Sequence, residues 1–158
     1  MSSATSGRVK AIFLCSDKGL PMQKVGQARA VQGRGLAGDR YASNKGAWSQ
    51  ARPTIRHVSL IASEAIKEGN SFIDVPFSWA ETRRNVVTEG VDLNALVGQE
   101  FMIGVVHMRG IELCTPCDRP SKLSGKKGFA HAFGGRGGIR AEILTNGIIF
   151  VLDPILIP

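Results

Sequence analysis

The stretch "EFMIGVVHMRGIELC", residues 100–114, decides how the chain is expected to fold. Its apolar residues recur at short intervals on both sides of Gly104, which is typical of two strands joined by a turn. Short apolar segments at residues 8–16, 56–63 and 82–89 predict further strands. The sequence therefore predicts a mainly β domain that resembles a barrel and carries a few short helices.

The predicted helices are short. Residues 63–69 fit a helix that Ser63 caps and Gly69 ends, and residues 92–98 fit a single helical turn. Asn146-Gly147 lies between two apolar segments, and this dipeptide is a strong signal for a tight β-hairpin. We therefore expect the strands on either side of it to pair with each other.

Two long segments, residues 17–54 and 118–138, are rich in glycine and are expected to form loops. Loops of this length in a compact domain often carry function. We expect the second loop to be mobile and to order over an anionic ligand, because it has few apolar side chains to bury. Residues 1–7 are expected to form a disordered N-terminal tail, and residues 8–158 a single domain.

The bulk composition excludes several classes of protein. No apolar run reaches the length of about 18 residues that a transmembrane helix needs, so no membrane association is expected. The first residues contain no apolar core of a secretion signal. Three cysteines are too few for a disulfide scaffold. These features together predict a cytoplasmic protein.

The net charge of +7 is unevenly distributed along the chain. Residues 8–56 contain ten Lys and Arg against two acids, residues 57–118 four against nine, and residues 119–140 six against none. The two basic segments are also rich in glycine. Guanidinium groups and accessible backbone N–H groups together can bind an anion. The alternative is an ordinary solvated basic surface.

Two glycine-rich motifs occur within these basic segments. "GRGLAGDRY", residues 33–41, has the spacing of a dinucleotide fingerprint but no helix is expected after it, so a turn that presents Arg40 fits better. "HAFGGRGGIRAE", residues 131–142, is shorter than the disordered RGG segments that bind nucleic acid. Nucleic-acid binding is therefore not expected, and Arg136 and Arg140 are expected to face an anionic ligand.

Arg83 and Arg84 stand at the entrance of the strand predicted over residues 82–89. The alternation of side chains along a strand predicts that one of them points inward and the other outward. An arginine inside a β domain is costly unless it meets an anion or a carboxylate. The inward arginine therefore indicates either a bound anion or an internal ion pair.

Cys114 is the last residue of the stretch quoted at the start, and Cys117 follows three positions later. A closed zinc site lacks a fourth ligand, and a thioredoxin-type dithiol lacks its βαβ unit. Two inert core cysteines remain an alternative, because free cysteine is often buried. However, Cys117 is close to Arg119 and to the most basic segment, and nearby cations favour the reactive thiolate form.

The order of the segments "GLAGDRY", "IRHVSLIASEAI", "RRNVVTEGVDLNALVGQEFMIG", "CTPCDRP" and "RGGIRAEILTNG" resembles the MOSC domain family, the C-terminal domain of molybdenum cofactor sulfurases, in its small stand-alone form. The resemblance covers about residues 8–154. One departure is Leu152-Asp153-Pro154, where relatives often have Gly-Asp-Pro.

This resemblance implies a β-barrel-like fold and one reactive cysteine, which falls on Cys117 because it follows the proline. In the family this cysteine is thought to carry sulfur as a persulfide or to bind molybdenum in a pterin cofactor, and some relatives take part in reducing N-hydroxylated compounds. A separate electron donor or sulfur donor protein would then be a partner. Pyridoxal phosphate belongs to a separate fused domain and is not predicted here.

A thiolate suits a high-valent metal held by sulfur, and a pterin with a phosphate tail is a large anion that needs arginines and accessible backbone. Cys117 is the predicted catalytic residue and metal ligand. The residues predicted to bind a molybdenum cofactor of the molybdopterin type are Arg40, Arg56, Arg83, Arg84, Asn85, Arg136, Gly137, Gly138 and Arg140. The predicted activity is that of a molybdenum-dependent oxidoreductase or a sulfur transferase. The alternative is a non-enzymatic module that binds a nucleotide-like anion or RNA and has structural cysteines.

Overall fold

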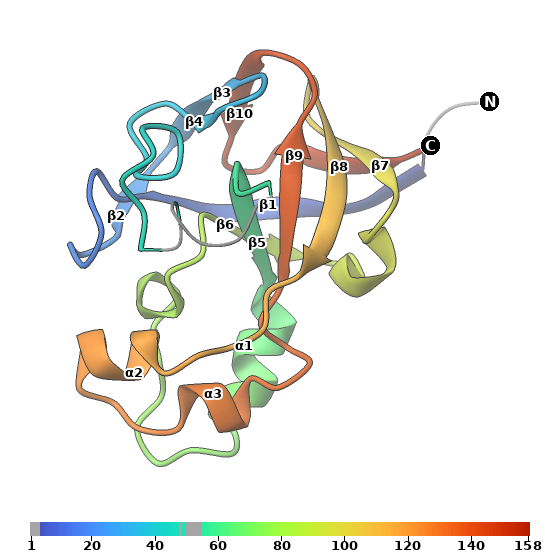
Figure 1. Cartoon of the computed structure of the whole chain (residues 1–158). Coiled ribbons are helices and arrows are strands. Elements are labelled where there is room, and N and C mark those ends of the chain that lie inside the picture. Colours follow the sequence, from blue (N-terminus) through green and yellow to red (C-terminus); the bar gives the residue numbers. More distant parts are fainter. Residues whose placement is uncertain (1–3, 48, 50–54) are drawn as a thin grey trace.

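Seven strands close into a barrel in the computed structural model, which describes residues 4–47, 49 and 55–158 (Figure 1). The strands are β1 (Ala4–Leu14), β5 (Val58–Ala62), β6 (Val86–Glu89), β7 (Glu100–Ile103), β8 (Val106–Leu113), β9 (Ile139–Ile143) and β11 (Pro154–Ile157). Their order is β11-β7-β8-β9-β5-β6-β1, and pairing of β1 with β11 closes the ring. Strand β2 (Gln23–Val25) adds to the other end of β1. The predicted mainly β, barrel-like fold with a few short helices is confirmed.

The barrel forms because its strands alternate between apolar residues that face inward and residues that face out. In β8, Val106 and Met108 are buried whereas His107 and Arg109 are exposed. Most neighbouring strands are antiparallel, but β5 and β6 run parallel. A parallel pair needs a long crossover connection. Here it contains helix α1 (Ser63–Asn70) and the 3-10 turn η1 (Ala80–Thr82).

A small second sheet of β10 (Gly147–Phe150), β3 (Gln27–Val31) and β4 (Gly35–Leu36) packs on one end of the barrel (Figure 1). Its buried residues Leu36 and Ile149 join the barrel core. The predicted hairpin at Asn146-Gly147 is therefore wrong. Both edges of β9 are already occupied by β8 and β5, so β10 pairs with β3 instead. The Asn146 side chain accepts a hydrogen bond from the backbone N–H of Gln32 (2.7 Å).

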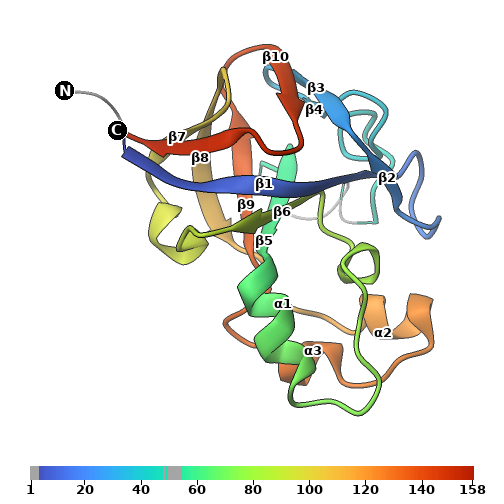
Figure 2. The ribbon, with the colours of Figure 1, turned by 180° about the vertical axis from the view of Figure 1, so that it is seen from behind.

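Three short helices gather at the opposite end of the barrel (Figures 1 and 2). They are α1, α2 (Arg119–Ser124) and α3 (Phe129–Ala132). Phe129 and Phe133 are fully buried and stack at 4.4 Å between ring centroids, and Phe77 meets Phe129 edge-on at 5.2 Å. The expectation that residues 118–138 form a loop is therefore wrong, because this segment contains α2 and α3 and its two phenylalanines lie in a second apolar cluster. Its ordering over an anionic ligand stays a prediction.

Two predicted boundaries also differ from the structure. Strand β1 begins at Ala4, which pairs with Ile157, so residues 4–7 are not a disordered tail, and residues 1–3 lie outside the described residues. Ser63 is the first residue of α1 rather than its cap. The predicted turn at residues 92–98 is present as the 3-10 turn η2 (Leu93–Leu96). The assignment of residues 8–158 to one domain stays a prediction.

Within the described ranges, no helix has the length and apolar character required to cross a membrane.

His57 is expected to make folding stability depend on pH. Its Nδ1 accepts a hydrogen bond from the backbone N–H of Ile143 (3.0 Å), and burial lowers the pKa of His57, although Glu142 acts in the opposite direction. The unfolded chain, with a histidine pKa of about 6.5, then binds the proton more tightly than the folded chain does. The neutral His57 therefore stabilises the folded chain at pH values above the histidine pKa of the unfolded chain. This stabilisation is lost as the pH falls toward the pKa of His57 in the folded chain. We expect the urea-unfolding free energy to decrease between about pH 7 and pH 5.

The matched variant is His57→Asn, because its Oδ1 can accept the same hydrogen bond and does not titrate. It should show a smaller decrease over this pH range. An unchanged decrease in His57→Asn would assign the effect to other groups.

Candidate functional site

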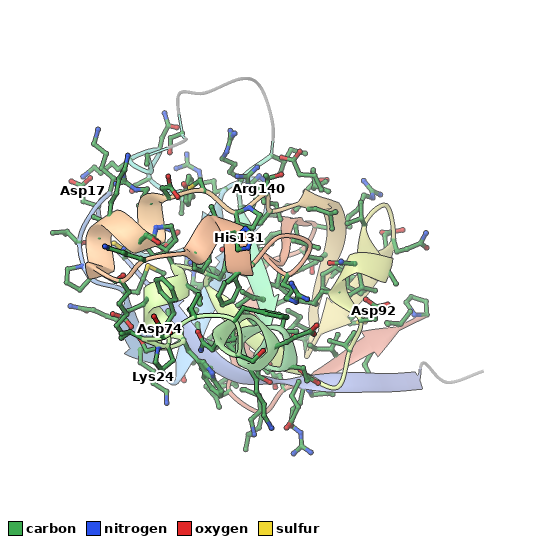
Figure 3. All side chains as sticks on the ribbon, turned by 90° about the horizontal axis from the view of Figure 1, so that it is seen from below. Asp17, Lys24, Asp74, Asp92, His131 and Arg140 are labelled. Atoms are coloured by element: carbon green, nitrogen blue, oxygen red, sulfur yellow. The ribbon has the colours of Figure 1, made fainter. Side chains whose placement is uncertain are left out.

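A pocket lined by arginines lies where the ends of β5, β8 and β9 meet the segment that leads into α2. The described residues of its lining include six arginines, namely Arg40, Arg56, Arg83, Arg84, Arg119 and Arg140. Asn85, Cys114 and Cys117 also line it, and no Asp or Glu occurs among the described residues of the lining. We call this the arginine pocket. Figure 3 views the molecule from the helical end, with Arg140 labelled.

Most of the predicted site residues are brought together here. The sequence scatters Arg40, Arg56, Arg83, Arg84, Asn85, Cys117 and Arg140 over a hundred positions, and all of them line the arginine pocket. The long connections before β5 and after β8 deliver Arg40 and Cys117, whereas β9 itself supplies Arg140. A site of this charge, built from distant parts of the chain, is suited to binding an anion.

The fully buried carboxylate of Asp39 organises one side of the arginine pocket. Its Oδ1 accepts hydrogen bonds from Arg40 Nη1 (3.1 Å), Asn85 Nδ2 (3.2 Å) and the backbone N–H of Cys15 (3.0 Å). Its Oδ2 accepts one from the backbone N–H of Tyr41 (3.2 Å). Hydrogen bonds to an ionised group are the strongest of their kind. Asp39 therefore fixes the positions of Arg40 and Asn85.

Arg83 is a buried cation of the pocket. It is 9% exposed, its backbone is left-handed (φ 65°), and its Nη1 donates to the Leu20 carbonyl (2.8 Å). Burial and the nearby charge of Arg40 lower the pKa of Arg83. In the part of the chain that the structure describes, it forms no ion pair with a carboxylate. A buried cation in this state favours the arrival of an anion.

Arg84 and Arg140 are held by partners within the protein. Arg84 Nε donates to the Gly137 carbonyl (2.8 Å), and Arg140 Nη1 pairs with Glu112 Oε1 (2.7 Å). The prediction that one of Arg83 and Arg84 points outward is wrong, since both line the pocket. Both precede β6, which starts at Val86, so strand alternation does not govern them.

The three cysteines differ in exposure. Cys15 is 2% exposed and Cys114 is 5% exposed, whereas Cys117 is only partly buried and lies between β8 and α2. Over residues 4–47, 49 and 55–158, no group of three His, Cys, Asp or Glu side chains gathers that could hold a metal ion. The described residues therefore offer no closed zinc site, and a metal bound here would have Cys117 as its accessible sulfur ligand.

Arg136, Gly137 and Gly138 do not line the arginine pocket. Arg136 Nη2 pairs with Glu68 Oε1 (2.8 Å), and its guanidinium lies 5.0 Å from the centre of the Phe72 ring. A Cβ at Gly138, whose φ is +87°, would clash with the Leu60 carbonyl, and one at Gly137 would meet the Cys114 carbonyl. These glycines allow close backbone packing instead.

Sequence reasoning missed several contributors to the site. Arg119, Tyr41, Ser59 and Thr115 line the pocket, and Asp39 supports it from behind. Arg119 was the easiest to find, because it follows Cys117 by two residues in the same basic segment. Tyr41 carried no signal beyond its position next to Arg40, whose guanidinium lies 4.7 Å from the centre of its ring.

A family model described as the MOSC domain matches residues 49–156 of the chain, which includes most of the arginine pocket. The chain belongs to the MOSC domain family. No curated protein sequence matches it closely enough to be compared.

Solved structures share the fold of this MOSC domain. The YuaD protein from Bacillus subtilis is 19% identical with a TM-score of 0.80, covering 95% of this chain and 94% of that one. YiiM from Escherichia coli is 14% identical with a TM-score of 0.69, covering 96% and 69%. YiiM from Geobacillus stearothermophilus is 12% identical with a TM-score of 0.66, covering 99% and 75%. At these identities the likeness establishes the fold alone.

Cys117 is expected to be the most reactive cysteine of this MOSC domain. It is the most accessible of the three cysteines. Arg119 lines the same pocket, and a nearby cation favours the reactive thiolate form. Alkylation with iodoacetamide near neutral pH, followed by peptide mass spectrometry, should show a fast phase in the wild type and in Cys114→Ser but not in Cys117→Ser. If Cys114→Ser removes the fast phase and Cys117→Ser keeps it, the two roles are reversed.

Arg83 and Arg140 are expected to differ in their contribution to stability. Arg140→Met removes the ion pair between Arg140 and Glu112, which should lower the unfolding free energy by about 0.5–1 kcal/mol. Arg83→Met also removes repulsion by Arg40, which offsets the lost hydrogen bond to Leu20. Urea unfolding at low ionic strength measures both effects. A larger loss for Arg83→Met than for Arg140→Met would contradict the assignment of Arg83 as an uncompensated cation.

Proposed function

We propose that this MOSC domain binds a molybdenum-pterin cofactor in the arginine pocket and that the thiolate of Cys117 is the protein ligand of its metal. The single observation that carries the proposal is the composition of the pocket, in which six arginines surround a partly exposed cysteine and no carboxylate is found among the described lining residues. The family to which the chain belongs is itself associated with the molybdenum cofactor.

The residues of the pocket fit such a cofactor in charge and in donor type. Arg119 would bind its anionic groups, since it pairs with no carboxylate in the described part of the chain. Arg40, held by Asp39, would present a fixed hydrogen-bond donor, whereas Asn85 donates to Phe13 and Asp39 and would support the site from behind. Cys117 supplies the soft sulfur ligand that a high-valent metal favours. When bound, the cofactor would supply either electron transfer or a transferable sulfur.

Two activities are consistent with this site. The first is reduction of N-hydroxylated compounds, with electrons from a separate donor protein. The second is sulfur transfer, in which the Cys117 thiolate attacks the outer sulfur of a persulfide on a donor protein, so that Cys117 becomes the persulfide and the donor is released as a thiolate. Both place the reacting group next to Cys117, and both suit a cytoplasmic protein. Pyridoxal phosphate has no part in either proposal.

Elemental analysis tests the proposal directly. The wild type, Cys117→Ser and the matched control Cys114→Ser are purified from a host that makes molybdenum cofactor. We expect molybdenum and pterin to copurify with the wild type and with Cys114→Ser, because Cys114 is buried. Cys117→Ser should lose most of the molybdenum, since serine is a poor ligand for a soft site.

Two outcomes would contradict the proposal. One is wild-type protein that carries no molybdenum. The other is equal molybdenum in Cys117→Ser and the wild type, which would remove Cys117 as a ligand. If metal is absent but Cys117→Ser still binds nucleotides or RNA as the wild type does, the alternative of a non-enzymatic binding module with structural cysteines is favoured.

A further inference from the structure

A second pocket adjoins the arginine pocket and differs from it in chemistry. It lies between α2, η1 and the segment that precedes β2, and its volume is about 240 Å³. Most of its lining is apolar, namely Pro21, Met22, Ala80, Pro120 and Leu123. We call it the apolar cleft. No residue predicted from the sequence as a site residue belongs to it except Arg83.

The two pockets share a wall. Arg83 and Pro120 line both of them. Arg119 lines the arginine pocket, and its Nη2 lies 3.7 Å from the position that a Cβ would occupy at Gly19, which lines the apolar cleft. Arg83 and Arg119, which pair with no carboxylate among the described residues, therefore lie at the boundary between a polar and an apolar compartment.

Apart from Arg83 at its boundary with the arginine pocket, the cleft offers little to a charged ligand. Its acidic residue, Glu81, pairs with Lys126 (2.5 Å between Nζ and Oε1), so the two charges offset each other. Leu123 is 43% exposed, and covering this side chain would remove apolar surface from water, which is favourable. An aliphatic or aromatic group is the ligand chemistry that suits this lining.

From these contacts we infer that the apolar cleft binds the apolar body of a small amphipathic substrate, while the polar end of that substrate meets Arg83, which lines both pockets. The inference rests on the proposed function in placing the reacting end near Cys117. It names the substrate class as small molecules that combine an acceptor-rich or anionic end with an apolar body, and it assigns α2 a role in specificity.

Straight-chain carboxylates test this inference on protein made without cofactor. Acetate, butanoate, hexanoate and octanoate share one polar end and differ in apolar length, and titration calorimetry or ligand-observed NMR measures their affinities. Burial of a CH₂ group contributes about 0.8 kcal/mol, or roughly a 4-fold gain in affinity per carbon at full burial. We expect affinity to rise steadily along the series until the cleft is filled.

The variant Leu123→Asn keeps the size of the side chain, adds no charge and changes a partly exposed position, so the fold should be retained. It should weaken octanoate binding by about 5-fold or more and leave acetate unchanged. Leu123→Met keeps an apolar side chain and should therefore show the same dependence of affinity on chain length as the wild type. Val105→Ser, at a position 69% exposed in the turn between β7 and β8, is the matched control and should change nothing.

Absence of octanoate binding, a flat series in the wild type, or an unchanged series in Leu123→Asn would each overturn the inference. Because these titrations need no metal, their outcome is separate from that of the elemental analysis. Molybdenum-containing protein with a flat series would reject the cleft alone, and metal-free protein with a rising series would reject the proposed cofactor alone.

Discussion

The buried carboxylate of Asp39 is the constraint on which the arrangement of the site depends. It accepts hydrogen bonds from Arg40, from Asn85 and from the backbone after β1. Asn85 in turn donates to the Phe13 carbonyl of β1 and accepts from the backbone N–H of Ser59 in β5. One negative charge therefore joins the loop that carries Arg40 to β1 and β5 of the barrel, and Asp39 does not itself line the pocket.

The pocket carries more positive charge than its internal partners offset. Asp39 and Glu112 each pair with one arginine of the lining, whereas Arg83 forms no ion pair with a carboxylate within the described residues. Burial of a guanidinium without a counter-charge opposes folding. A bound anionic ligand would supply the counter-charge that Arg83 lacks among the described residues. The buried arginine is therefore a stronger indication of function than the overall basic composition.

The sequence was informative wherever a local pattern governed the structure. Apolar alternation predicted the strands, and the motifs around Arg40, Arg83 and Cys117 predicted residues that converge on one pocket. The sequence did not predict contacts that depend on which other segments of the chain already occupy the edge of a strand or a cavity. Asn146-Gly147 has the chemistry of a hairpin, but β9 already has two neighbours, and this is a property of the whole sheet.

The same limit applies to Arg136 and to the segment after Cys117. Arg136 is as basic as Arg140 and four positions away, yet Glu68 and Phe72 hold it outside the pocket. Phe129 and Phe133 looked like minor members of a glycine-rich loop, but the crossover between β5 and β6 provides Phe77 as a partner. Neither contact leaves a trace in short-range sequence, because each joins segments more than 50 residues apart.

The pairing of β1 with β11 that closes the barrel also brings the two ends of the chain together, with Ala4 opposite Ile157 (Figures 1 and 2). In both views these ends lie at the edge of the barrel, away from the helical end at its base, where α2 borders the pocket. A protein joined to either end would be tethered to the barrel at a position away from the helices. Tethering of this kind raises the effective concentration of a partner. The barrel is thus suited to work either as a separate protein that meets its partners by diffusion or as one unit in a longer chain that carries them along.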